Sequence, residues 1–357
     1  GKWHLDGGPR DPGFVPPGLR RQGFEFWAAY QCHHQHFLPS YFRDTPEMIR
    51  VPKFEPEASC DFALEFLRTQ PRDQPFFLTV QMGPPHNPYG APEEYMRRYD
   101  PEKLTMPPNW RPGSETRPGT PGIPPNLRRP GMPDAYYVKT GGKEEIAAYY
   151  AAITALDDQV GRLLHALKKG GHDDNTIVLF TSDHGDMLGS HGLRRKRKPH
   201  EESAGVPGLL RWPARIPKGR VVDTLFSHVD MAPTLLGLSG LPVPASMQGA
   251  NLANVALGRT TAGPEAVLLQ IFVPFNPDGI HTPWRGIITA RHTYARYEQE
   301  PWVLFDNEND PWQMRNLATD PTRASLVAEL DRQLARIFHA FCVLFPAFVG
   351  GQAVSLR

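Results

Sequence analysis

The chain has 357 residues, of which 40% are hydrophobic, and its 39 basic and 38 acidic residues leave a formal net charge of +1. This length allows one large domain, or a large and a small one, with a sizeable core. The balanced charge gives no support for a nucleic-acid partner or an anionic membrane, and no apolar run of about 18 residues predicts a membrane span.

The three cysteines are Cys32, Cys60 and Cys342. Their positions fit neither the paired spacing of a zinc site nor a disulfide framework. The sequence therefore leaves the redox compartment and the localisation open, and it does not indicate an oligomeric state.

The first element is Gly-Lys-Trp-His-Leu at residues 1–5. On a strand, Lys2 and His4 would share one face because side chains alternate. Further along, the run QCHHQHF alternates Cys32, His34 and His36. Zinc binding is one interpretation of this run, although three donors from one short segment lack the usual spread. Substrate contact and a solvated loop are the others.

A short buried strand is predicted over residues 75–82, PFFLTVQM. It runs into a loop in which His86 is surrounded by Pro84, Pro85 and Pro88. A histidine on a stiff loop after a strand suits a proton donor. An ordinary turn histidine is the alternative.

An amphipathic helix is predicted over residues 146–167, and Gly170 and Gly171 should end it. Its apolar residues recur at steps of three and four: Ile146, Tyr149, Ile153, Leu156, Val160, Leu163 and Leu167. Strands are expected at 176–182 and 206–212. A helix, a short loop and an apolar strand in succession are typical of an α/β sheet.

The stretch TSDHGDMLGSHGLRRKRK follows the strand predicted at 176–182. Sites in α/β sheets form beyond the carboxyl ends of strands. Asp183 offers a hard oxygen and His184 an imidazole, which together suit part of a divalent-cation site. The alternative is an aspartate that caps a helix beside a hydrogen-bonded histidine.

The basic run at residues 194–198 also has two interpretations. Five consecutive cations usually form a solvated face or a nucleic-acid patch. One lysine held beside a metal would instead bind a tetrahedral anion, since the ammonium is a compact point charge.

The pattern changes after about residue 258. Residues 266–272, 285–298 and 302–306 predict antiparallel strands, and Asp320-Pro321 should open a helix. The apolar positions expected to face inward on this helix are Leu326, Leu330, Leu334, Ile337 and Phe341. We therefore expect an α/β domain at 1–258 and a smaller α+β subdomain at 259–357.

Taken together and in this order, the motifs resemble the sulfatase family of the alkaline-phosphatase superfamily. GKWHL resembles its Gly-Lys-Trp-His-Leu-Gly motif, with Asp6 at the last position, and PPHNPY resembles its Pro-His-x-Pro-Tyr loop. SDHGDMLGSHG with Lys196 and EES at 201–203 resembles its metal- and sulfate-binding segment. RGIITARHTYARYE through LFDNENDPWQMRNLA resembles its C-terminal subdomain. The implied fold is a mixed or parallel sheet sandwiched by helices, followed by an antiparallel subdomain.

The resemblance implies a sulfuric ester hydrolase whose substrate is a small-molecule or carbohydrate sulfate ester. Asp183 and His184 would bind Ca²⁺, with Mn²⁺ or Zn²⁺ as alternatives. Lys196 and Lys2 would hold sulfate oxygens. A cation and lysines at these positions would stabilise charge on the transferring group.

The resemblance also implies proton-transfer roles. His4, with Lys2, would assist the nucleophile, and His86 would protonate the leaving alcohol, because an imidazole moves protons near neutrality. The histidine run borders the substrate pocket in the family, so His34 is expected to contact substrate.

One family motif is missing from this sequence. The family's nucleophile is a cysteine oxidised to formylglycine, or a serine, within Cys/Ser-x-Pro-x-Arg, and no such motif occurs here. We expect the chain to be the C-terminal portion of a sulfatase that lacks about a hundred N-terminal residues, by comparison with the family. Alone, it is expected to be inactive and prone to aggregate. The alternatives are a phosphodiester or phosphonate monoester hydrolase of the same superfamily and a non-catalytic anion-binding relative.

Overall fold

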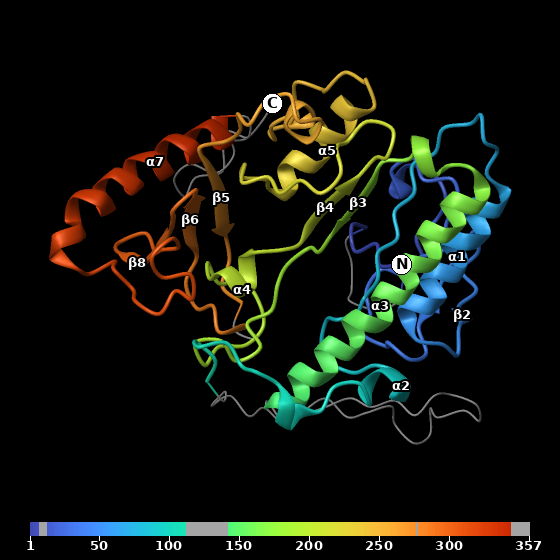
Figure 1. Cartoon of the computed structure of the whole chain (residues 1–357), viewed down its shortest axis with the longest axis horizontal. Helices are drawn as coiled ribbons and strands as arrows, with labels where there is room; N and C mark the ends of the chain where they lie inside the picture. The colour runs from blue at the N-terminus through green and yellow to red at the C-terminus, as the bar shows by residue number, and fades with distance from the viewer. Residues whose placement is uncertain (7–12, 112–141, 276–277, 344–357) are drawn as a thin grey trace. The chain divides into compact units, whose positions relative to one another are not determined.

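The computed structural model describes residues 1–6, 13–111, 142–275 and 278–343, and the chain divides into two compact units (Figure 1). The first unit contains Gly1–Met106 and Pro112–Thr176, and the second contains Pro107–Arg111 and Ile177–Arg357. The domain boundary predicted after residue 258 lies inside the second unit and stays a prediction.

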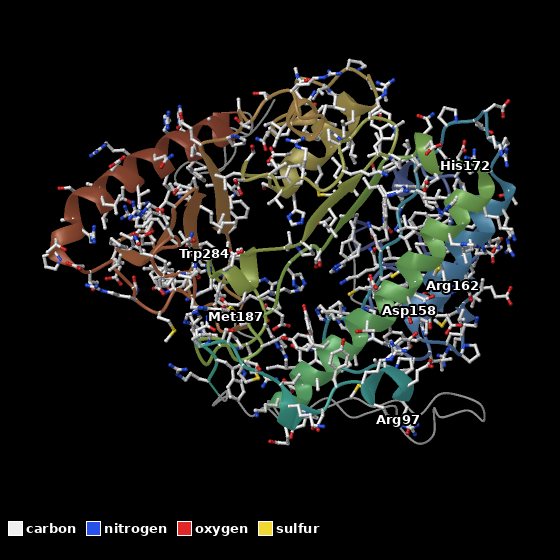
Figure 2. All side chains as sticks on the ribbon, viewed as in Figure 1. Arg97, Asp158, Arg162, His172, Met187 and Trp284 are labelled. Carbon is white, nitrogen blue, oxygen red and sulfur yellow. The ribbon has the colours of Figure 1, made fainter. Side chains whose placement is uncertain are left out.

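Two long helices lie side by side in the first unit, α1 (Glu55–Thr69) and α3 (Lys143–Gly170) (Figure 1). The helix predicted over 146–167 is confirmed as α3, and it ends at Gly171, whose φ of 75° suits glycine. Arg162 of α3, labelled in Figure 2, forms an ion pair with Asp61 of α1 at 2.7 Å. The short helix α2 (Glu93–Met96) packs on α3 as well.

The buried face of α3 differs from the predicted stripe. Ile153 is 41% exposed, so its predicted inward position is wrong. The buried face is instead rich in alanines, namely Ala147, Ala148, Ala151, Ala152 and Ala155. Periodicity arguments give weight to large apolar residues, whereas small side chains let a neighbouring element approach closely. The alanine face of α3 is therefore the one that packs against the neighbouring elements.

The rest of the first unit is loop-rich. Strands β1 (Ser40–Tyr41) and β2 (Ile49–Arg50) pair antiparallel. Its described residues also include short 3-10 helices at Leu19–Arg21, Pro101–Lys103 and Asp173–Asn175.

Residues 75–82 were predicted to form a strand, but the structure assigns none there. A strand is defined by its ladder of backbone hydrogen bonds. Among the described residues, this segment takes part in one such bond to another segment, from Lys2 N–H to the Gln81 carbonyl at 3.1 Å.

In the second unit, β3 (Val178–Thr181) and β4 (Gly208–Arg211) form the predicted strands and pair antiparallel. Helix α4 (Glu201–Ala204) lies between these two strands in the chain, and helices α5 (His228–Leu238) and α6 (Ala253–Ala256) follow β4. A core of Trp212, Leu238 and Ala253 lies among these elements.

Asp230 is the third residue of α5. Its carboxylate accepts the backbone N–H of Ser227, the N-cap residue, at 2.8 Å and that of Ala250 at 2.7 Å. It therefore stabilises the first turn of α5 and ties a distant loop to it.

The C-terminal part of the second unit is a four-stranded antiparallel sheet with the order β5-β6-β7-β8. Its strands are β5 (Ala266–Ile271), β6 (Trp284–Thr289), β7 (His292–Arg296) and β8 (Pro301–Asp306). The long strand predicted over 285–298 is in fact two strands, β6 and β7, because the chain turns between them.

The predicted C-terminal helix is confirmed as α7 (Ala324–Val343), which follows a 3-10 turn at Pro321–Arg323 and packs against β5 and β6 (Figure 1). Leu330 and Leu334 are buried. Leu326 and Ile337 pack against the same core, while the Phe341 side chain lies outside the described residues.

Candidate active site

Three predicted site residues converge just past the carboxyl end of β3. The Lys196 ammonium lies 2.5 Å from His184 Nε2, and Asp183 Oδ2 lies 3.5 Å from the same nitrogen. His184 Nδ1–H donates to the Gly185 carbonyl at 2.7 Å, which places the proton on Nδ1 and the lone pair on Nε2. Burial is the main cause that lowers the pKa of His184, so the neutral ring is favoured.

Gly185 holds this segment in place. Its N–H donates to the Ser203 carbonyl at 3.0 Å, and a Cβ at this position would lie 2.1 Å from the Glu202 carbonyl oxygen. Only glycine allows this close approach of two backbones. The Ser203 hydroxyl also accepts the backbone N–H of Lys198 at 3.1 Å, so the EES segment anchors both the His184 loop and the basic run.

The donor set suits a cation. The Asp183 carboxylate and the His184 Nε2 lone pair are both hydrogen-bond acceptors, and their polar atoms lie 3.5 Å apart. Two acceptors this close are stabilised by a positive charge that interacts with both. In this structure the Lys196 ammonium supplies that charge. The Asp183 side chain is 81% exposed, so an ion could reach it. No group of three or more His, Cys, Asp or Glu side chains in the described part of the chain is arranged to hold a metal, so Asp183 and His184 would provide part of a coordination shell.

The basic run is folded into the second unit rather than solvated. Asp278, whose side chain is 3% exposed, accepts Arg197 at 2.6 Å and lies 3.6 Å from Arg195. The Lys198 ammonium donates to the carbonyls of Asp278 at 2.5 Å and Arg194 at 2.7 Å. Residues on either side of Lys196 therefore turn toward Asp278, and the Lys196 ammonium lies beside His184 instead.

Further contacts fix Arg197. Its guanidinium lies over the Phe275 ring at 3.7 Å, and its carbonyl accepts the indole N–H of Trp284, the residue labelled in Figure 2, at 3.1 Å. A cation over an aromatic face and a buried ion pair together order a segment that would otherwise repel itself.

Asp278→Asn should lower the free energy of unfolding by about 2 kcal/mol, since a cation loses its buried partner but stays partly hydrated. Urea unfolding of the variant would measure this loss. Glu265→Gln is the matched control, because the pair of Glu265 with Arg336 is 69% and 65% exposed and should change stability by less than about 0.5 kcal/mol. An equal loss of unfolding free energy in both variants would contradict the conclusion that Asp278 stabilises the basic run.

In the first unit, the GKWHL segment is tied to two other segments. Lys2 forms a parallel bridge with Tyr30, and Trp3 N–H donates to the Tyr30 carbonyl at 2.8 Å. Trp3 is buried against Trp27, and His4 is exposed. His4 has a φ of 53°, so the extended backbone ends at Trp3. The prediction that Lys2 and His4 share one face of a strand assumed an extended conformation that does not continue through His4.

The proline-rich loop presents His86 beside His34. Their rings stack in parallel, with centroids 4.4 Å apart and an interplanar angle of 7°. His86 Nδ1–H donates to the Asn87 carbonyl at 2.6 Å, which leaves Nε2 as the nitrogen that exchanges protons. The Pro84-Pro85 and Asn87-Pro88 peptide bonds are cis.

The other two histidines of the run are buried and serve as hydrogen-bond donors. His33 stacks on Tyr30 at 3.7 Å and its Nε2 donates to the Ser40 carbonyl at 3.1 Å. His36 Nε2–H donates to the His86 carbonyl at 3.0 Å. The zinc interpretation of the run finds no support in the described residues, since none of them forms a three-donor metal group.

Burial lowers the pKa of His33 to about 4 and that of His36 to about 3, from 6.5, with the charges of neighbouring histidines adding to the effect. Both rings therefore stay neutral in the folded protein at pH values where the unfolded chain takes up protons. Each stabilises the fold fully above pH 6.5 and loses that contribution as the pH falls toward its folded pKa.

Unfolding at pH 7 and pH 5 should therefore differ by about 2 kcal/mol for each of these two histidines. The measurement is the free energy of unfolding across this range. His33→Gln keeps a donor toward Ser40 but removes the titration, so it should reduce the pH dependence by about half of the combined effect. An unchanged pH dependence in this variant would rule out His33 as a source of acid lability.

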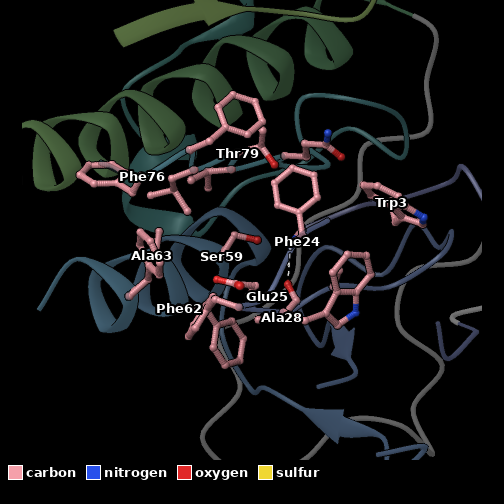
Figure 3. A pocket seen from close by; sticks show the side chains of 18 of the residues that line it. Trp3, Phe24, Glu25, Ala28, Ser59, Phe62, Ala63, Phe76 and Thr79 are labelled. Carbon is pink, nitrogen blue, oxygen red and sulfur yellow. Dashed lines mark hydrogen bonds between the residues drawn. The ribbon is translucent and has the colours of Figure 1, made fainter. Parts of the chain in front are cut away.

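A pocket of about 350 Å³ lies elsewhere in the first unit (Figure 3). Its wall combines the GKWHL segment, residues 22–29 and residues 74–81, with Phe24 and Phe76 facing inward. Lys2 is the one predicted site residue in its lining, and His34 and His86 are not part of it. Its aromatic wall offers little to an anion.

The structure thus gathers Asp183, His184 and Lys196 in the second unit, and His34 with His86 in the first. Two contributing residues escaped the sequence-based prediction: Asp278, which orders the basic run, and Glu55, a buried carboxyl bonded to Gly83 N–H at 2.8 Å. Neither lies in a motif, and each acts on a segment distant in sequence, so no local signal could have found them.

Comparisons with known proteins identify the family of the chain. It matches the family model "Sulfatase" over residues 1–241 and the model "N-sulphoglucosamine sulphohydrolase, C-terminal" over residues 189–340. The chain therefore belongs to the sulfatase family, within the alkaline-phosphatase superfamily.

Individual relatives agree with this assignment. An ulvan-active sulfatase of Formosa agariphila is 35% identical over 340 residues, which cover 94% of this chain and 61% of the relative. An endo-4-O-sulfatase of Bacteroides thetaiotaomicron is 32% identical over 346 residues, which cover 89% of this chain and 63% of the relative. The chain spans less than two thirds of the length of both.

A solved structure confirms the predicted α/β fold of the alkaline-phosphatase type. The yidJ protein of Bacteroides fragilis is 31% identical and superimposes with a TM-score of 0.73 over 92% of this chain and 68% of that protein. In the described part of the chain, no helix is both long and apolar enough to cross a membrane.

Proposed function

We propose that the protein carrying this chain hydrolyses sulfate monoesters with cleavage of the S–O bond. The observation that supports this most is the convergence of Asp183, His184 and Lys196 at the end of β3, with 2.5 and 3.5 Å between their polar atoms. A carboxylate, an imidazole lone pair and an ammonium at this spacing can hold a cation and a tetrahedral anion together.

In this proposal, Asp183 and His184 would hold a divalent cation, which would supply positive charge beside the sulfuryl group that is transferred. Lys196 and Lys2 hold the sulfate oxygens as point charges. Ca²⁺ is the first candidate, although calcium favours oxygen ligands. The imidazole of His184 keeps Mn²⁺ and Zn²⁺ as alternatives.

The residues that we propose for proton transfer belong to the first unit. His4, with Lys2, assists the hydroxyl of the nucleophile, which we propose is a formylglycine or a serine outside this sequence. His86 protonates the leaving alcohol through Nε2, because Nδ1–H is bound to the Asn87 carbonyl. His34 stacks against the His86 ring and could contact the substrate at the same place.

The substrate class is proposed from relatives. One is named an ulvan-active sulfatase and another an N-acetylglucosamine-6-O-sulfatase, and both names specify a carbohydrate. We propose a carbohydrate sulfate ester as the natural substrate and expect activity on small aryl sulfates.

A panel of esters tests the function. The full-length protein that carries the chain would be assayed with 4-nitrophenyl sulfate, a sulfated oligosaccharide, 4-nitrophenyl phosphate, bis(4-nitrophenyl) phosphate and a phosphonate monoester. Release of inorganic sulfate at a rate above that for every phosphorus ester is expected. Preference for a phosphodiester or phosphonate would support the alternative hydrolase, and no turnover with tight sulfate binding would support a non-catalytic relative.

A further inference from the structure

Glu55, the first residue of α1, is the most deeply buried acid among the described residues of the first unit. Its exposed fraction is 0%, and burial raises its pKa. A carboxyl group in such a place is costly unless hydrogen bonds replace water. Ser59 Oγ–H donates to Oε1 at 2.7 Å, and the Tyr41 hydroxyl lies 3.4 Å from the same oxygen. The second oxygen, Oε2, accepts the Gly83 N–H at 2.8 Å.

Gly83 begins the loop that carries His86, three residues later. A second contact holds the same loop, since His36 Nε2–H donates to the His86 carbonyl at 3.0 Å. Glu55 and His36 are themselves joined, because Glu55 N–H donates to the His36 carbonyl at 2.7 Å. We call Glu55 and His36 the loop clamp.

The clamp leaves little free space around the loop. A Cβ added at Gly83 would lie 3.3 Å from His36 Cε1 and 3.3 Å from the Tyr30 hydroxyl oxygen. The loop therefore rests directly on the residues that hold it, and a small change at Glu55 should move the His86 backbone.

A simpler interpretation is that Glu55 only stabilises the N-terminus of α1, where acids are favourable. Glu57 shows what that role looks like, since its side chain is 42% exposed and pairs with Lys53 within the same stretch of chain. The Glu55 carboxyl instead is buried and bonds a residue 28 positions away. Its contacts are those of a support for the loop.

We propose that Glu55 is a positioning residue, which fixes His86 through Gly83 N–H and His36 so that the imidazole can protonate the leaving group. This inference rests on the proposed proton-donor role of His86. Misplacing a proton donor by about 1 Å can cost about a hundredfold in rate, because the transfer depends on geometry.

The dependence of the rate on the leaving group separates positioning from simple structural support. A 4-nitrophenol leaves without a proton, whereas a sugar alcohol needs one. Glu55→Gln is therefore expected to lower kcat on a sulfated sugar by about 10- to 100-fold, with a change of less than about threefold on 4-nitrophenyl sulfate and little change in KM. Glu57→Gln, the matched control on the same helix, should leave both rates unchanged.

Two further variants complete the test. Gly83→Ala leaves the carboxyl intact but crowds the clamp, so it should reproduce the leaving-group-selective loss even if Glu55→Gln fails to fold. In a His86→Ala background, Glu55→Gln should cause no additional loss, since the group that it positions is gone.

Three outcomes would overturn the inference: equal losses on both substrates in Glu55→Gln and Gly83→Ala, wild-type rates in both, or full additivity with His86→Ala. A separate result would concern the proposed function. If His86→Ala itself showed no preference for good leaving groups, the proton-donor role of His86 would fail and the inference with it. If His86→Ala showed that preference and the clamp variants did not, the positioning role of Glu55 alone would be wrong.

Discussion

Asp183→Ala should lower sulfate-ester turnover by about 10³-fold or more, the largest effect expected from any single change in the second unit. The carboxylate of Asp183 is exposed and lies 3.5 Å from His184 Nε2. Without this carboxylate, His184 is the one remaining proposed ligand of the cation among the described residues. An imidazole alone binds a hard divalent ion weakly. Initial rates on 4-nitrophenyl sulfate, with the metal content of the purified variant, would measure the effect.

The matched control is Asp223→Ala, which removes an exposed aspartate of the same unit. It should retain wild-type rates and metal content, because Asp223 belongs to none of the groups gathered at the end of β3. Wild-type turnover in Asp183→Ala, or an equal loss in Asp223→Ala, would contradict the placement of the cation at Asp183 and His184.

His86→Ala should produce the second large effect, a loss of about 10²- to 10⁴-fold on a sulfated sugar. On 4-nitrophenyl sulfate the loss should stay below about tenfold, because 4-nitrophenol is a good leaving group without protonation. The orientation of the ring supports this role, since Nδ1–H is bound to the Asn87 carbonyl and Nε2 is the exchanging nitrogen. Steady-state kinetics on both substrates is the measurement.

His165→Ala is the control for this variant, since His165 is an exposed histidine of α3. It should leave both rates unchanged. A loss of the same size on both substrates in His86→Ala would mean that the residue supports the fold or binds sulfate, and that another group donates the proton.

The sequence predicted most of the elements correctly where a single segment carries its own signal. The helix α3 and its end at Gly171 follow from apolar spacing and a glycine pair, and α7 follows from the leucines after Asp320-Pro321. The motif also predicted that Asp183 and His184 lie just past a strand, which β3 provides.

The predictions were less successful where the structure of a segment depends on another segment that packs against it or forms hydrogen bonds with it. The buried face of α3 is its alanine side, because the packing neighbour selects the face and periodicity does not identify that neighbour. Residues 75–82 have the composition of a strand, but a ladder needs adjacent strands to be assigned. The two buried acids, Asp278 and Glu55, act on segments 81 and 28 residues away.

In the basic run, too, the role of each residue depends on partners that are distant in the sequence. Five consecutive cations at 194–198 have no sequence feature that distinguishes Lys196 from its neighbours. The structure separates them because Asp278 takes Arg195 and Arg197, while the Lys196 ammonium lies at His184. The role of Lys196 in holding sulfate is a proposal that this separation supports.

Metal removal and replacement tests most directly whether a divalent cation at Asp183 and His184 supports sulfate-ester hydrolysis. The full-length protein would be stripped with a chelator and assayed on 4-nitrophenyl sulfate after addition of Ca²⁺, Mn²⁺, Zn²⁺ or Mg²⁺, one at a time. Activity should vanish on stripping, return with at least one of these ions, and fail to return in Asp183→Ala. Full activity in the metal-free protein would contradict the proposal.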